Sequence, residues 1–255
     1  MARYTADGYV IRGLSTGESS RVITLFTVEN GKLKCMAKGV RKSASSKGGA
    51  LELFSHVKCN VYLKENVELG QISSVDVLDD FAAILADPYK FGFSSALCEV
   101  IDKLTIVLHP ISELYTLLGE YFDIISRTGN NVSAMIFWGA FLKALTINGY
   151  QPRLFECVVC GKLNDGKAAY YDPQKGGIIC QSDLIEHVQY GKLSASSLRA
   201  MQLALTGPLA NLADLAVTIK MLGEIEQFIM SFADYHTGLR RNLKSFKFLS
   251  QLKSQ

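Results

Sequence analysis

The sequence lacks any long uninterrupted apolar segment. No window of its 255 residues holds the roughly 18 consecutive apolar residues that a membrane-spanning helix needs. Residues 1–13 also lack the continuous apolar stretch of a secretory signal. We therefore expect a soluble, cytoplasmic protein.

Cysteine and proline are scarce as well, with six and five residues. So few, unevenly spaced cysteines in a chain of this length exclude an extracellular disulfide framework. A content of 48% hydrophobic and 20% charged residues excludes a disordered tail or a collagen-like fibre. The chain is long enough for one or two packed domains.

The first eighty residues are rich in β-branched and aromatic side chains, which favour strands. We expect five short strands, at residues 9–14, 21–28, 32–40, 56–63 and 68–77. The pair Asn30-Gly31 is typical of a tight type I′ turn, so the second and third strands should be antiparallel neighbours. The polar, glycine-ended residues 41–49 are expected to form an exposed loop.

From Pro88 the apolar period becomes helical, and helices are expected at about 88–108, 111–127 and 131–147 and again from about 194 to the end. The predicted fold class is α+β multidomain, with a five-stranded OB-type β-barrel followed by an α-helical domain that carries a zinc-ribbon-like insert. We place the barrel in residues 1–80, the helical domain in 81–255 and the insert at about 153–190.

The net charge of +3 is unevenly distributed. Residues 1–50 hold nine basic and three acidic side chains, residues 81–150 hold four and six, and the part after Asp234 holds five basic residues and no acid. A cationic segment on a barrel suits a polyanion, because neutralised phosphates release condensed counterions. Arg41 and Lys42 are the clustered candidates, and charge alone adds Lys34 and Lys47.

Aromatic side chains of the predicted barrel have two interpretations. They can stack on bases, or they can belong to the core, as barrel aromatics at alternate positions usually do. The residues concerned are Tyr9, Phe26, Phe54 and Tyr62. At the other end of the chain, apolar residues at three- and four-residue steps predict a helix that docks on the body with its cations outward; they are Leu239, Leu243, Phe246, Leu249 and Leu252.

Three of the six cysteines form a metal-binding pattern. Cys157 and Cys160 are separated by two residues, and Cys180 follows after nineteen more. One tight turn brings a C-x-x-C pair to a single tetrahedral ion, and a distant half-site completes the set. The fourth cysteine of a structural zinc ribbon would fall at Asp183, whose carboxylate can bind zinc, and His187 is the second candidate.

Other interpretations of this insert stay open. A ribbon that folds without metal is one, and a redox C-x-x-C is another, although no βαβ pattern surrounds the pair.

A serine enzyme is a further alternative, because residues 13–17 around Ser15 match the G-x-S-x-G string. That motif needs a following helix, and a strand is expected there instead.

Several short stretches of the chain occur together in one order. They are residues 17–21, 24–27, 30–32, 37–42, 48–51 with Phe54, 148–150, 157–161, 176–178 before Cys180, and 243–245 with 248–249. Each stretch is weak alone, but in their order and spacing they give a specific resemblance to the bacterial RecO family of recombination mediators, over essentially the whole chain.

The resemblance implies an N-terminal OB domain, a helical domain with an inserted zinc ribbon, and a protein that is not an enzyme. Such proteins bind single- and double-stranded DNA, anneal complementary strands and, with RecR, help to load RecA onto DNA coated by single-strand binding protein (SSB), at the nucleoid. The family's DNA contacts correspond here to Lys38, Arg41 and Lys42. Asp183 stands where ribbon-bearing relatives have cysteine. The alternative function is an OB-fold adaptor between proteins, without nucleic-acid activity.

Overall fold

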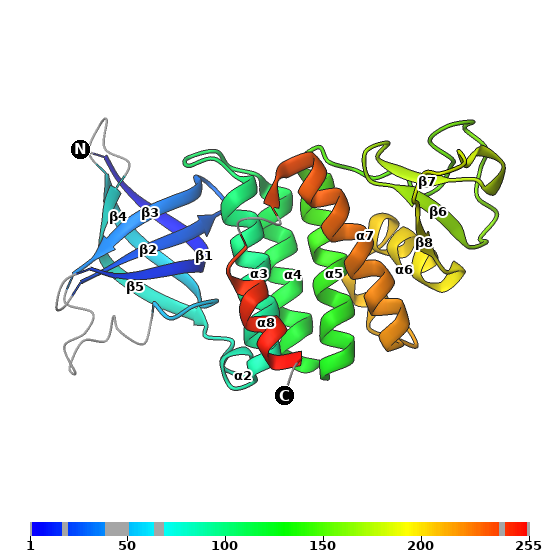
Figure 1. The fold of residues 1–255 in the computed structure, drawn as a ribbon. Helices are drawn as coiled ribbons and strands as arrows, with labels where there is room; N and C mark the ends of the chain where they lie inside the picture. The colour runs from blue at the N-terminus through cyan, green and yellow to red at the C-terminus, as the bar shows by residue number, and fades with distance from the viewer. Residues whose placement is uncertain (1, 17–19, 39–50, 64–68, 240–242, 254–255) are drawn as a thin grey trace. The chain divides into compact units, whose positions relative to one another are not determined.

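Five strand pairings, four antiparallel and one parallel, close the N-terminal part of the chain into a barrel (Figure 1). The structure is a computed structural model and describes residues 2–16, 20–38, 51–63, 69–239 and 243–253. Its contacts divide the chain into two units, residues 1–126 and 127–255. The domain limits at residue 80 and at about 153–190 stay predictions.

The strand order around the barrel is β1-β2-β3-β5-β4, with β4 returning to β1. All neighbours are antiparallel except β3 and β5, which run parallel. This is the arrangement of a five-stranded OB-type barrel, as predicted. The strands are β1 (Ala2–Thr16), β2 (Ser20–Thr27), β3 (Gly31–Ala37), β4 (His56–Leu63) and β5 (Leu69–Asp79).

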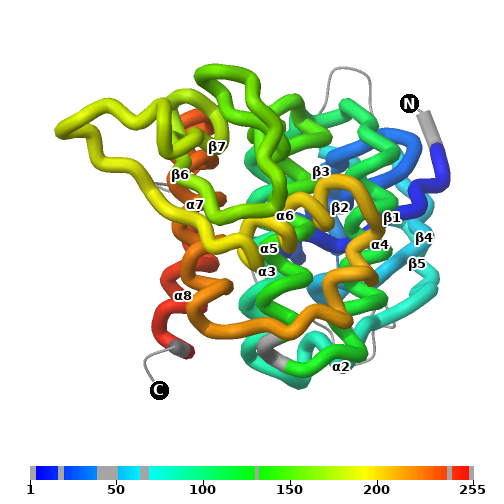
Figure 2. The backbone as a smooth tube through the Cα atoms, turned by 90° about the vertical axis from the view of Figure 1, so that its right-hand side faces the viewer, coloured from blue at the N-terminus to red at the C-terminus, as the bar shows by residue number. Residues whose placement is uncertain are grey.

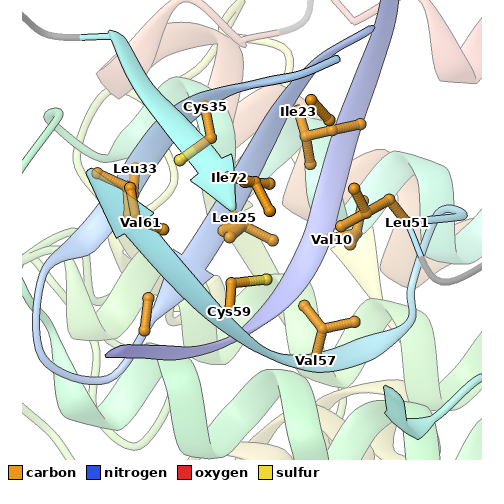
Figure 3. Close-up of a cluster of buried hydrophobic side chains, with 12 residues drawn as sticks. Val10, Ile23, Leu25, Leu33, Cys35, Leu51, Val57, Cys59, Val61 and Ile72 are labelled. Carbon is orange, nitrogen blue, oxygen red and sulfur yellow. The ribbon is translucent and has the colours of Figure 1, made fainter. Parts of the chain in front are cut away.

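Alternate side chains of these strands fill the barrel interior (Figure 3). Val10, Ile23 and Leu25 are fully buried there, together with the thiols of Cys35 and Cys59. Burial raises the pKa of both thiols to about 12, so they pack as small apolar groups. Residues at alternate positions of each strand therefore point into this core.

The hairpin between β2 and β3 differs from the prediction. The two strands are antiparallel neighbours, as expected, but Thr27 pairs with Gly31 and a three-residue loop lies between them. A type I′ turn needs a left-handed backbone at both central residues. Here Gly31 has it, at φ +61°, and Asn30 does not. The Thr27 hydroxyl accepts from the backbone N–H of Asn30 at 3.1 Å and donates to the carbonyl of Gly31 at 3.0 Å, which stabilises the wider loop.

The first unit also contains α2 (Ala82–Leu85), α3 (Pro88–Leu104) and α4 (Ser112–Arg127). Helix α3 begins at Pro88, in the first-turn position where the missing N–H costs nothing. The Asp87 carboxylate caps this end by accepting from the backbone N–H groups of Tyr89 at 2.8 Å and Lys90 at 3.1 Å.

The second unit contains α5 (Asn130–Ile147), α6 (Ala195–Thr206), α7 (Ile219–Thr237) and α8 (Ser245–Lys253). Helix α5 carries the buried Trp138, which stacks on Phe141. The predicted docking of the C-terminal stripe is confirmed for Leu239, Leu243 and Leu249, which are all buried. No helix of the described residues is long and apolar enough to cross a membrane.

A small three-stranded sheet lies between α5 and α6 in the sequence, in the order β7-β6-β8. Its strands are β6 (Ala169–Asp172), β7 (Gly177–Ile179) and β8 (Gly191–Leu193). Figure 2 follows the chain from this sheet into α6 and α7. The Tyr171 ring packs edge-on against Phe228 of α7, with 4.9 Å between ring centroids, and so anchors the insert on the helices.

Candidate nucleic-acid interface and metal site

The two described cations of the predicted DNA-binding set are Lys34, in the middle of β3, and Lys38, just after its C-terminal end. Lys34 points away from the interior, because its neighbours Leu33 and Cys35 point into the core, and it is half-buried. Lys38 follows β3 and is exposed. Within the described part of the chain neither lysine forms an ion pair. The other predicted contacts, Arg41, Lys42 and Lys47, lie outside the described residues.

Three of the four candidate stacking aromatics are buried and belong to the core. Tyr9 is 7% exposed, and Phe26 and Phe54 are fully buried. Tyr9 and Phe26 pair across β1 and β2 on the outside of the barrel, and helix α4 contacts Tyr9 there. The ring of Phe122 on α4 lies 5.5 Å from that of Tyr9. Only Tyr62 of the four is partly exposed.

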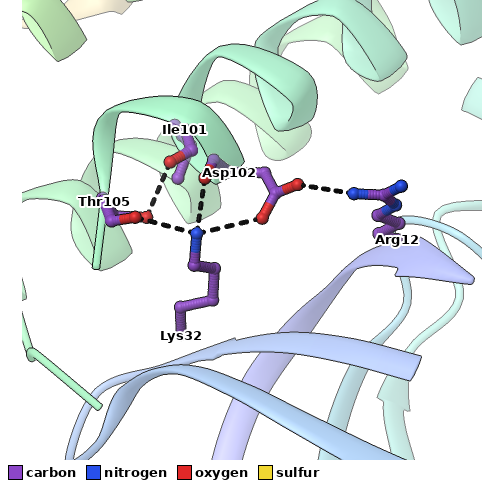
Figure 4. Close-up of polar contacts among 5 residues, drawn as sticks. All are labelled: Arg12, Lys32, Ile101, Asp102 and Thr105. Carbon is purple, nitrogen blue, oxygen red and sulfur yellow. Dashed lines mark hydrogen bonds and ion pairs between the residues drawn. The ribbon is translucent and has the colours of Figure 1, made fainter. Parts of the chain in front are cut away.

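A buried lysine on the same strand serves the fold. Lys32 donates through Nζ to the carbonyl oxygen of Thr105 at 2.8 Å and to that of Asp102, and forms an ion pair with the Asp102 carboxylate at 3.1 Å (Figure 4). These carbonyls belong to the C-terminal end of α3, where the last carbonyl oxygens have no partner within the helix. A cation there acts as a hydrogen-bond donor to them and interacts favourably with the helix dipole. Arg12 binds the other oxygen of the Asp102 carboxylate at 3.1 Å. No sequence pattern pairs Lys32 with a residue seventy positions away, so the sequence interpretation missed this role.

The structure brings the four predicted metal ligands together. The ligand atoms of Cys157, Cys160, Cys180 and Asp183 all lie within 4.8 Å of one another. The Sγ atoms of Cys160 and Cys180 are 4.0 Å apart, and the Cys157 thiol donates to the Asp183 carboxylate at 3.1 Å. The second candidate, His187, is exposed and outside this group.

Two short backbone segments position these ligands. A short hairpin runs from Glu156 to Leu163. In it the N–H of Cys157 donates to the carbonyl of Lys162 at 2.9 Å, and the N–H of Gly161, at φ +73°, donates to the carbonyl of Cys157 at 3.0 Å. After β7 the N–H of Asp183 donates to the carbonyl of Cys180 at 3.1 Å in a single 3₁₀ turn. A C-x-x-C turn and a C-x-x-D turn therefore face each other.

Backbone N–H groups lower the pKa of the Cys157 thiol. Burial opposes ionisation of this thiol, but backbone N–H groups of Cys160, Cys180 and Val159 outweigh it and lower its pKa. Two of these groups donate to the Sγ atom, the Val159 N–H at 3.4 Å and the Cys180 N–H at 3.3 Å. Hydrogen bonds from the thiols of Cys160 and Cys157 lower the pKa of Asp183.

This donor set fits a tetrahedral thiophilic cation. Zinc binds thiolate sulfur at about 2.3 Å and carboxylate oxygen at about 2.0–2.2 Å, which places two thiolates of a tetrahedron about 3.8 Å apart. The 4.0 Å between Cys160 and Cys180 is close to that spacing. The four residues can therefore hold a metal ion.

Comparison with known families covers both halves of the chain. Residues 1–81 match the family described as Recombination protein O N terminal, and residues 85–245 match Recombination protein O C terminal.

Individual relatives align over nearly the whole length. The chain is 27% identical to a protein named DNA repair protein RecO of Pelotomaculum thermopropionicum, over 98% of this chain and 95% of the relative. It is 30% identical to the protein of that name from Anaeromyxobacter sp. (strain K), over 99% of this chain and 98% of the relative. The chain belongs to the RecO family of DNA repair proteins.

Proposed function

We propose that this protein is a non-catalytic recombination mediator. It binds single- and double-stranded DNA, anneals complementary strands and, together with RecR, helps to load RecA onto strands coated by SSB, at the nucleoid in the cytoplasm. Membership of the RecO family supports a role in DNA repair. The alternative, an adaptor that uses an OB barrel only to contact proteins, keeps the same fold and lacks the DNA step.

The observation that carries the proposal is the placement of the β3 cations. Lys34 on β3 and Lys38 just after it form no ion pair with any described residue. In the sequence they precede Arg41, Lys42 and Lys47. Cations that are free of carboxylate partners can neutralise phosphates and release counterions. Lys32 and Arg12, which are paired with Asp102, contribute less to such a surface.

Annealing needs no catalytic side chain in this scheme. Two single strands repel each other through their phosphates, and neutralisation of that charge on one protein surface lowers the repulsion. Base pairing then supplies the free energy of the duplex. The β3 cations and the basic segment after them thus act by binding both strands without bond making or breaking.

The metal site has a structural role in the proposal. A zinc ion held by Cys157, Cys160, Cys180 and Asp183 would cross-link the hairpin before residue 161 to the turn after β7. Zinc in such a closed, four-ligand site supplies folding free energy and no Lewis-acid chemistry. It would hold these two parts of the insert, at about residues 153–190, together.

Annealing of SSB-coated complementary strands, with and without the protein, tests the proposal. A mediator accelerates duplex formation on coated strands. Fluorescence anisotropy with a labelled single strand at low and at moderate salt separates the two functions. Absence of binding at low salt would favour the adaptor.

A further inference from the structure

The three thiols of the candidate metal site differ in their exposure to solvent. Cys160 is exposed in the turn of the hairpin, and Cys180, directly after β7, is half-buried. Cys157 is buried, with only 1% of its surface exposed. Because oxidation of cysteine follows the exposure of its sulfur, a reagent in solution reaches Cys160 first.

The exposed sulfur has a second sulfur beside it. The Sγ atoms of Cys160 and Cys180 are 4.0 Å apart, although nineteen residues separate the two cysteines in the sequence. A disulfide bond needs about 2.05 Å between its sulfurs, so an approach of about 2 Å converts this contact into a bond. Redox-active cysteines commonly have such a resolving thiol next to them.

The turn that carries Cys160 has room for this approach. Gly161 follows Cys160 with a left-handed backbone, at φ +73°. Apart from its chain neighbours, no atom of the described residues lies within 4 Å of the point where a Cβ atom of residue 161 would stand. Movement of this turn therefore displaces no packed neighbour at that point.

The other two ligands form a pair of their own. The Cys157 thiol donates to the Asp183 carboxylate at 3.1 Å. Its Sγ atom also accepts from the backbone N–H groups of Val159 at 3.4 Å and Cys180 at 3.3 Å. The four ligands thus divide into a hydrogen-bonded pair around the buried sulfur and a pair of more exposed sulfurs. Joining the exposed pair leaves the buried sulfur with hydrogen-bond partners.

We propose that Cys160 and Cys180 form an oxidation site for peroxides, at which a disulfide bond between the two turns excludes the metal ion. Sulfurs joined in a disulfide are no longer thiolate ligands. Only Cys157 and Asp183 then remain of the four ligands that a structural zinc site needs. The inference rests on the proposed structural role of the metal and adds a condition under which that role is lost.

The reaction balances with a peroxide as the oxidant. The Cys160 sulfur attacks the peroxide and its O–O bond breaks, so that one oxygen stays on the sulfur as a sulfenic acid and the other leaves as water or an alcohol. The Cys180 sulfur then attacks the sulfenic sulfur. The S–S bond forms while the S–O bond breaks, and water leaves. In total the two thiols lose two electrons and two protons, which the peroxide takes up.

A reductant can reverse this reaction. Exposed disulfides are the labile ones, because a small thiol reaches one of the sulfurs and displaces the other. The exposed position of Cys160 makes its sulfur the point of attack. The site can therefore pass repeatedly between a metal-binding form and a disulfide form.

Peroxide treatment of the full-length, zinc-loaded protein tests the proposal. Hydrogen peroxide is added, a chromogenic chelator follows the released zinc, and non-reducing peptide mapping by mass spectrometry identifies the bond. We expect a bond between Cys160 and Cys180, loss of two of the six free thiols, and about one equivalent of zinc released for each disulfide. Dithiothreitol with added zinc should restore the thiols and the metal.

Two variants locate the reaction. Cys180→Ser removes the resolving thiol, so peroxide should leave Cys160 as a sulfenic or sulfinic acid and form no disulfide within the insert. Cys98→Ala alters a buried thiol of α3 and is the matched control. It should form the Cys160–Cys180 bond in the same yield as the unaltered protein. Circular dichroism confirms that both variants are folded.

The outcomes distinguish this inference from the proposed role of the metal. Purified protein that binds no zinc and still forms the Cys160–Cys180 bond would contradict the metal role and support the oxidation site. A bond between Cys157 and Cys160 would overturn the inference. Six thiols that stay reduced in peroxide, or zinc that stays bound after the disulfide has formed, would overturn it as well.

Discussion

The ammonium group of Lys32 lies 2.8 Å from the carbonyl oxygen of Thr105, which joins strand β3 to the end of helix α3. The same group is paired with Asp102, and the Lys32 side chain is only 8% exposed. Lys34, two residues further along β3 on the same outer side, has no such partner among the described residues. One strand therefore carries a structural lysine and a lysine available to a ligand.

Exchange of these two lysines for methionine should separate stability from DNA binding. Lys32→Met removes one partner of a buried pair and leaves acceptors at the end of α3 unsatisfied, so we expect a loss of about 3 kcal/mol in the free energy of unfolding. Lys34→Met should change the free energy of unfolding by less than about 0.5 kcal/mol and weaken DNA binding. Urea denaturation and fluorescence anisotropy measure the two effects. Equal destabilisation by both variants would contradict the assignment.

The barrel and most helix limits could be predicted from the sequence because they depend on local pattern. Strand β4 has the predicted bounds of residues 56–63. Strand β1 begins at Ala2, seven residues earlier than predicted, because Tyr4 and Thr5 stand there among Ala, Asp and Gly residues that carry little strand signal. The burial of Lys32 and Tyr9 could not be predicted. Strand alternation places both side chains outside the barrel, and only the tertiary fold shows that helices cover them.

The metal ligands, unlike Lys32 and Tyr9, could be predicted because their placement depends on local sequence. Each half of the set spans four residues, so local turns fix most of its geometry. Spacing proposed Asp183 before His187, and the structure gathers Asp183 with the three thiols.

Neutralisation of the predicted DNA contacts should change the salt dependence of binding. Arg41→Ala with Lys42→Ala should weaken binding to all sequences alike, because phosphate contacts carry no sequence information. If each cation contacts one phosphate, the slope of log K against log salt on single strands should fall by about 1.4 in magnitude. The measurement is a salt titration of anisotropy.

A charge-matched control accompanies this variant. Lys103→Ala with Lys220→Ala removes two exposed cations from α3 and α7. The net charge changes equally, and the slope should stay at its original value. If both double variants reduce the slope alike, net charge rather than the segment after β3 governs binding.

Zinc analysis should find about one equivalent in the purified protein, as a single four-ligand site requires. Asp183→Ala should lower zinc affinity at least about tenfold, because it leaves three protein ligands. Asp183→Cys should retain the metal, and His187→Ala should have no effect, since His187 lies outside the ligand group. Chelator competition measures these affinities. Zinc well below one equivalent, or loss of zinc from His187→Ala alone, would contradict the assignment.

The carboxylate of Asp7 should make stability depend on pH in the acid range. Burial acts to raise the pKa of Asp7, but hydrogen bonds from Tyr115 and His56 outweigh it and hold the pKa below its ordinary value of 3.8. The His56 contact measures 2.7 Å. Since the folded state favours the ionised carboxylate, its stabilising contribution is present above the unfolded pKa and is lost as pH falls through the folded one.

Replacement of this carboxylate by an amide measures the effect. Asp7→Asn should lower the urea midpoint at about pH 5, and the difference from the unaltered protein should shrink as the pH falls below about 3.8, because Asp7 is then protonated first in the unfolded state and afterwards in the folded one. Tyr115→Phe removes a donor and should reduce the pH-dependent difference, whereas Asp76→Asn, at an exposed position on β5, should not. A midpoint difference for Asp7→Asn that is as large at about pH 3 as at about pH 5 would mean that shape or packing, and not the charge of Asp7, joins β1 to β4 and α4.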